Sequence, residues 1–98
     1  MDTDILTSTG VYANEALEVS NEAVTLTVDN GSGGSSAATD VLFLKKKIYK
    51  SDGTLFGTCT SASATSLVFS GLSNAIANND VLYAYPTIYL GPKVKITN

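Results

Sequence analysis

The stretch EAVTLTVDN, residues 22–30, carries the clearest secondary-structure signal in the chain. Its three large apolar residues, Val24, Leu26 and Val28, alternate with polar ones. A period of two is the pattern of a β-strand that has one face on a core and the other face in solvent. The stretch therefore predicts a half-buried strand.

The composition of the whole chain extends this prediction to an all-β domain. Of the 98 residues, 44% are hydrophobic and 15% are charged, which is too hydrophobic for disorder and enough for a single core. Eight glycines and many Ser, Thr and Asn residues favour strands joined by polar turns. We expect one domain over residues 1–98, a small β-sandwich or partly open barrel of about six to eight short antiparallel strands. Residues 1–16 could form an extended, irregular N-terminal arm.

A hairpin is predicted in the stretch DVLFLKKKIYKSDGTLFG, residues 40–57. Asp52-Gly53 lies between apolar residues, and this dipeptide favours turns in which both central residues have a positive φ. A two-residue loop would place Tyr49 opposite Phe56, whereas a three-residue loop would place Ile48 there instead.

Three consecutive lysines, Lys45, Lys46 and Lys47, precede this turn and follow the apolar run 41–44. That run predicts a strand with the core on one side and another layer or subunit on the other. Adjacent strand residues point to opposite faces, so at least one lysine would share a face with apolar side chains. The lysines could protect a strand edge from aggregation or dock an acidic protein partner. Nucleic acid is disfavoured because the chain has no arginine.

Three tyrosines, Tyr83, Tyr85 and Tyr89, share one parity of the alternating run 81–90 and are predicted to lie on one face. Tyrosine offers a large contact area with a polar tip, which suits a protein interface or a stacked sugar. A sheet face half covered by a neighbouring strand is the alternative. With Tyr49 and the three lysines, these tyrosines are our candidate partner interface.

The charges are distributed unevenly along the chain. Residues 1–40 contain seven carboxylates and no lysine, whereas residues 41–98 contain six lysines and two carboxylates. If this asymmetry survives folding, it suits head-to-tail contact between copies or docking on a patterned partner. Neighbouring strands could instead mix the two halves on the surface.

The residue types argue against an enzyme or a metalloprotein. The chain has no histidine, so the usual base of a hydrolytic triad is absent. Cys59 is the only cysteine and is expected to be a small hydrophobic residue within a strand. Asp2, Asp4 and the turn 78–80 could offer oxygen ligands to calcium, but their spacing matches no EF-hand. We expect a non-enzymatic protein with no metal and no cofactor.

No targeting signal is recognised in the sequence. The N-terminal residues are acidic where a signal peptide is basic, and no apolar run reaches the length of a membrane span. We expect a protein that is made in the cytoplasm and does not enter a membrane.

The stretch SLVFSGLSNAIANNDVLYAYP, residues 66–86, resembles a pattern in tailed-bacteriophage structural proteins. A short strand ends in a Gly-Leu turn, a loop of small residues follows, and Asn-Asn-Asp-Val-Leu-Tyr begins the next strand. In its small size and its composition rich in Thr, Ser and Gly, the chain is similar to capsid decoration (cement) proteins.

This resemblance implies a non-enzymatic protein on the exterior of a virion, where it would bridge capsomers. Its partners would be the major capsid protein or another virion protein, together with further copies of itself, with a trimer favoured. No functional residue is carried over from the family. A receptor-binding or glycan-binding β module of a tail fibre or surface appendage is the alternative.

Overall fold

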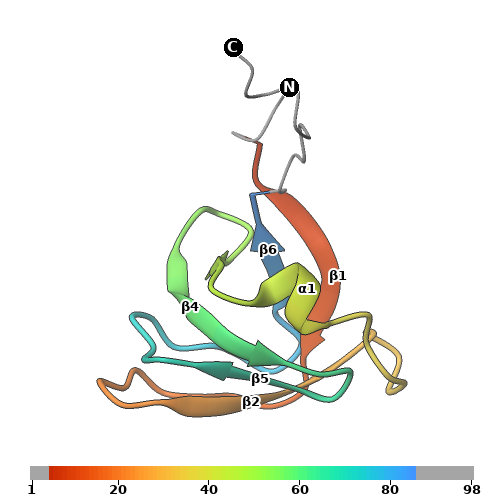
Figure 1. Ribbon diagram of the computed structural model, residues 1–98, viewed down its shortest axis with the longest axis horizontal. Helices are drawn as coiled ribbons and strands as arrows, with labels where there is room; N and C mark the ends of the chain where they lie inside the picture. Colours follow the sequence, from red (N-terminus) through yellow and green to blue (C-terminus); the bar gives the residue numbers. More distant parts are fainter. Residues whose placement is uncertain (1–4, 86–98) are drawn as a thin grey trace.

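The computed structural model describes residues 5–85, which form six short strands and one helical turn. The strands are β1 (Thr7–Ala13), β2 (Val24–Asp29), β3 (Lys47–Tyr49), β4 (Leu55–Ala62), β5 (Ser66–Phe69) and β6 (Val81–Ala84), and the helical turn is α1 (Asp40–Phe43). Neighbouring strands are antiparallel and close a ring in the order β1-β2-β5-β4-β3-β6. The ring is an irregular barrel, with α1 over one open end (Figure 1). The predicted all-β fold is confirmed.

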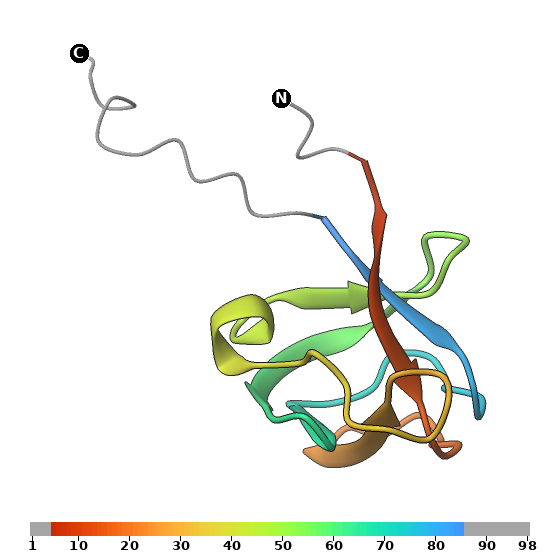
Figure 2. The ribbon, with the colours of Figure 1, turned by 90° about the vertical axis from the view of Figure 1, so that its right-hand side faces the viewer.

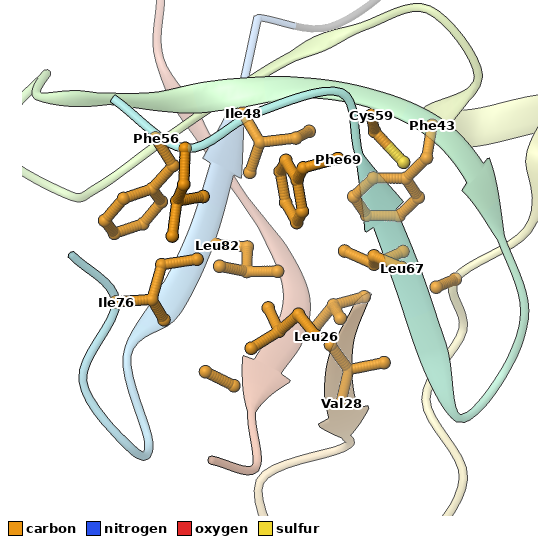
Figure 3. Close-up of a cluster of buried hydrophobic side chains, with 14 residues drawn as sticks. Leu26, Val28, Phe43, Ile48, Phe56, Cys59, Leu67, Phe69, Ile76 and Leu82 are labelled. Atoms are coloured by element: carbon orange, nitrogen blue, oxygen red, sulfur yellow. The ribbon is translucent and has the colours of Figure 1, made fainter. Parts of the chain in front are cut away.

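The core of the barrel is built by the inward side chains of all six strands and of α1. The strand predicted from residues 22–30 is β2, in which Leu26 and Val28 are buried and the intervening threonines are exposed. The largest buried side chains are Phe43, Phe56 and Phe69. Figure 3 shows Phe69 near the centre of the cluster, between side chains of β3, β5 and β6. The alternation read from the sequence therefore identifies the core face.

The ring closes through two short stretches of strand pairing, β1 with β2 and β3 with β6. β1 and β2 share only two residue pairs, and β3 and β6 share the single pair Tyr49 and Tyr83. By contrast, β2 and β5 share four successive pairs. β1 and β6 lie side by side along one wall of the barrel (Figure 2). The barrel is irregular because these two strand pairs share so few residues.

The hairpin predicted at Asp52-Gly53 is confirmed and joins β3 to β4. Its loop has three residues, because Gly53 N–H donates to the Lys50 carbonyl at 2.9 Å and Lys50 N–H donates to the Thr54 carbonyl at 2.8 Å. Gly53 has a φ of 92°, a conformation that glycine adopts without steric cost. Asp52 does not have a positive φ, so the expected turn with two positive φ angles is wrong; in a three-residue loop only the last residue needs one.

A β-bulge changes the register of this hairpin two residue pairs beyond the loop. Ile48 pairs with Gly57, so Phe56 has no partner of its own in β3 and turns fully into the core. Lys47 then pairs with Thr58, which is the register of a two-residue loop. Neither predicted loop length therefore describes the whole hairpin.

The strand predicted for residues 41–44 is wrong, because this run begins within the helical turn α1. The Leu44 N–H donates to the Asp40 carbonyl at 2.8 Å, and the Asp40 carboxylate accepts the Ala62 N–H at 2.6 Å. Lys45 follows with a φ of 64°. A short run that is apolar at every position has no period, so it fits one helical turn as well as a strand.

The region considered as an N-terminal arm, residues 1–16, contains β1. This strand pairs with β6 at Thr7 and Ser8 and with β2 at its other end. Residues 7–13 are therefore part of the barrel wall, while residues 1–4 lie outside the described part of the chain.

Replacing Gly57 with alanine should destabilise the fold, because the added Cβ would collide with the backbone carbonyl oxygen of Gly71. A backbone segment cannot move aside as a flexible side chain can. We expect the free energy of unfolding to fall by about 2–3 kcal/mol, which urea denaturation would measure.

Gly34→Ala is the matched control, since the added Cβ would approach only the side chain of Asn30 in an exposed loop. This variant should lose less than about 1 kcal/mol. Equal losses in the two variants would show that the contact with Gly71 is not what requires a glycine at position 57.

Candidate functional site

One row of side chains crosses the outside of the barrel from β1 to β4. In register, Ser8 pairs with Tyr83, Tyr83 with Tyr49, and Tyr49 with Leu55. Residues directly opposite each other in an antiparallel pair lie on the same face of the sheet. The adjacent residues Leu82 and Ile48 are fully buried, so the row faces outward. The chain thus places two tyrosines from distant segments next to each other.

Tyr85 extends this row into a larger aromatic surface. Its ring meets the ring of Tyr49 edge to face, with 5.3 Å between centroids and an angle of 78° between planes, a favourable arrangement for aromatic pairs. Tyr85 is 41% exposed, whereas Tyr49 and Tyr83 are half-buried. We call Tyr49, Tyr83 and Tyr85 the tyrosine stripe. Tyr89 lies outside the described residues.

Only one of the three predicted lysines belongs to the same strand face as the stripe. Lys47 is in β3, two residues before Tyr49, and is exposed. Lys45 lies in the turn after α1, and Lys46 is half-buried. The backbone of both pairs with Cys59: Lys45 N–H donates to the Cys59 carbonyl at 2.7 Å, and Cys59 N–H donates to the Lys46 carbonyl at 2.8 Å.

A groove of about 510 Å³ opens beside the stripe, at Leu55. Gly57 and Gly71 lie on its floor, where the Gly57 backbone approaches the Gly71 carbonyl oxygen, and the segment 19–21 borders it on the side away from β4. One wall includes Leu55 and Thr58, and the other includes Val19, which is 58% exposed. The remaining lining residues are mostly polar. The groove therefore combines an apolar contact with hydroxyl and amide groups.

The hairpin next to the stripe has a defined charge arrangement. Hydrogen bonds from Thr54, including its N–H at 2.9 Å, hold the pKa of the Asp52 carboxyl below its usual range, and the charge of Lys50 adds to this effect. Asp52 is therefore ionised at neutral pH.

The described residues contain no group of three or more His, Cys, Asp or Glu side chains that could hold a metal ion. Cys59 is fully buried in β4, as the sequence predicts, and its thiol donates to the Ser61 carbonyl at 3.2 Å. Burial raises the pKa of this thiol above its ordinary value of 9.0. A buried thiol with a raised pKa is a poor nucleophile, so Cys59 acts as a core residue.

Several residues of this surface carry no signal in the sequence. Val19 and Leu55 are ordinary apolar residues in chain order, and only the fold brings both to one groove. Thr58 lies opposite Lys47 only because of the β-bulge, since a three-residue loop without a bulge would place Gly57 there.

No protein-family model, curated protein or solved structure matches the chain. Within residues 5–85, no helix is long and apolar enough to cross a membrane.

The buried thiol predicts how stability changes with pH. Because the pKa of Cys59 is higher in the folded state than in the unfolded state, its contribution is complete below the unfolded pKa and is lost as pH rises toward the folded pKa. Between about pH 8 and about pH 10, the free energy of unfolding of the wild type should fall more than that of Cys59→Ala. Urea denaturation at several pH values measures both proteins.

The alanine variant controls for every other ionisable group, because these groups are the same in the two proteins. It also carries a constant loss of packing, which does not depend on pH. Parallel stability curves for the two proteins would contradict a raised pKa at Cys59.

Proposed function

We propose that this protein is a non-enzymatic structural component of a virion, a decoration protein that binds the capsid exterior and bridges capsomers. The observation that carries the proposal is the tyrosine stripe on the outer face of β3 and β6. Tyrosine is enriched at protein interfaces because it combines a large apolar area with a hydroxyl that tolerates water. The partner would be the major capsid protein or another virion protein.

The segment that resembles decoration proteins supplies most of this surface. Residues 66–85 run from β5 through a loop into β6, and this stretch ends in Tyr83 and Tyr85. Tyr49 joins them from the β3–β4 hairpin. The segment that carries the resemblance therefore also contributes two of the three tyrosines of the proposed capsid-binding surface.

The neighbours of the stripe favour a protein partner over a glycan. Stacking of a sugar needs an open aromatic face beside acids or amides that can bind its hydroxyl groups. Here Tyr49 and Tyr83 are half-buried, Tyr85 meets Tyr49 edge to face, and the exposed charge on the same β3 face is Lys47. A partially covered aromatic surface beside a cation suits a second protein with acidic groups.

The double variant Tyr83→Ala with Tyr85→Ala should fold and should lose capsid binding. We would mix purified protein with virus particles whose genome encodes this chain but from which the chain has been deleted. A density gradient would then separate the particles, with any bound protein, from free protein. The wild type should band with the particles. The variant should bind at least about tenfold more weakly, since buried aromatic anchors commonly contribute 2 kcal/mol or more.

Leu44→Ser is the matched control, because Leu44 is an exposed apolar residue next to α1 and away from the stripe. It should bind particles as the wild type does. Particle binding by the double tyrosine variant that equals the wild type would disprove the role of the stripe. Binding of wild type to a glycan array but to no particle would support the appendage module instead.

A further inference from the structure

We propose that the groove beside the tyrosine stripe is a two-fold interface with a second copy of this chain. The inference goes beyond the proposed virion role and does not depend on it. It rests on the distribution of charge and apolar groups around the groove, which makes this face complementary to itself.

The two sides of the groove carry opposite charges. On one side, Lys47 pairs directly with Thr58, which lines the groove, so the two side chains share the outer face. On the other side, Glu18 and Glu22 flank the lining residues 19–21, and all three charged side chains are exposed. The groove thus lies between a basic edge and an acidic edge.

Backbone hydrogen bonds connect the two charged edges through the residues that line the groove. Thr58 accepts a backbone hydrogen bond from Ser70 at 3.0 Å, and Gly71 and Leu72 follow along the groove. Leu72 then exchanges two backbone hydrogen bonds with Ser20, at 2.8 and 3.0 Å. Lys47 and the acidic segment therefore lie at opposite ends of the line, with the groove between them.

The acidic edge is held rigidly. Residues 18 and 19 lie between two isolated β-bridges, one from Leu17 to Ile76 and the other from Ser20 to Leu72. The Ser20 hydroxyl also accepts the Glu22 N–H and donates to the Glu22 carbonyl, both at 3.0 Å. A surface fixed in this way loses little conformational freedom when a partner binds.

A two-fold axis through the groove matches these features. Rotation by 180° places the basic edge of one copy over the acidic edge of the other, so the Lys47–Glu22 contact forms twice. The exposed Val19 of each copy meets the wall formed by Leu55 and Thr58 of its partner, which removes an exposed apolar side chain from water. A three-fold ring needs two different faces on each copy. Here both charged edges border the same groove, so one face is enough and a two-fold dimer results.

Charge reversal tests the pairing. We would measure the solution mass of wild type, Lys47→Glu, Glu22→Lys and the double variant by sedimentation, from about 10 µM to about 1 mM. The wild type should move from one to two copies with concentration, and less so at high salt. Each single variant should weaken association about tenfold, because each reversal affects two symmetric contacts, and the double variant should recover most of the loss.

Lys45→Glu is the matched control, since it makes the same charge change in the turn after α1, outside the line described above. It should weaken association less than Lys47→Glu does. A second readout is the double variant Val19→Cys with Thr58→Cys, which places a thiol of each copy against a thiol of its partner and should give a disulfide-linked dimer on mild oxidation. Ser63→Cys, at the exposed end of the β4–β5 hairpin, should not.

Three results would overturn the two-fold pairing. They are a monomer at every concentration, a trimer or open chain in place of a dimer, and a dimer that neither single charge reversal weakens. Loss of pairing together with normal particle binding would leave the proposed capsid role intact. Normal pairing without particle binding would support the two-fold interface and contradict the capsid role.

Discussion

The β-bulge at Phe56 in β4 is the constraint on which both the core and the outer face depend. One extra residue opposite Ile48 lets Phe56 and Gly57 both turn inward, while their neighbours on either side face outward. In an uninterrupted two-residue register, Phe56 would lie opposite Tyr49, and the barrel would lose one of its largest core side chains. The absence of a side chain at Gly57 then lets the backbone of Gly71 approach closely.

That close approach connects the core to the candidate interface. Because Gly71 lies against β4, the following residue Leu72 can pair with Ser20 and hold the acidic segment beside the hairpin. The same hairpin carries Tyr49 to its single pair with Tyr83, which closes the barrel between β3 and β6. The tyrosine stripe and the groove therefore both depend on how the β3–β4 hairpin packs, and neither is an independent feature of the surface.

Local signals in the sequence predicted the elements that depend on local physics. The alternation in β2 and the hairpin at Asp52-Gly53 each depend on neighbouring residues, and both are confirmed, although Asp52 does not adopt the expected positive φ. The strand prediction for the run 41–44 is wrong because a short run that is apolar at every position has no period. The helical turn also has a distant contact, in which the Asp40 carboxylate accepts the Ala62 N–H. The shared face of Tyr83 and Tyr85 follows from alternation, but the partner of Tyr83 does not, since β3 and β6 are neighbours only in the closed ring.

The charge asymmetry of the chain has a different meaning after folding. In sequence, acids fill the first part and lysines the second, which suggests a molecule with two opposite poles. In the fold, the pairing of Ser20 with Leu72 brings part of the acidic half to one edge of the groove, and Lys47 lies at the opposite edge. Opposite charges that border one groove favour a partner related by a two-fold axis, whereas opposite poles favour a chain or ring. Long-range pairing therefore decides which kind of self-association the charges can support.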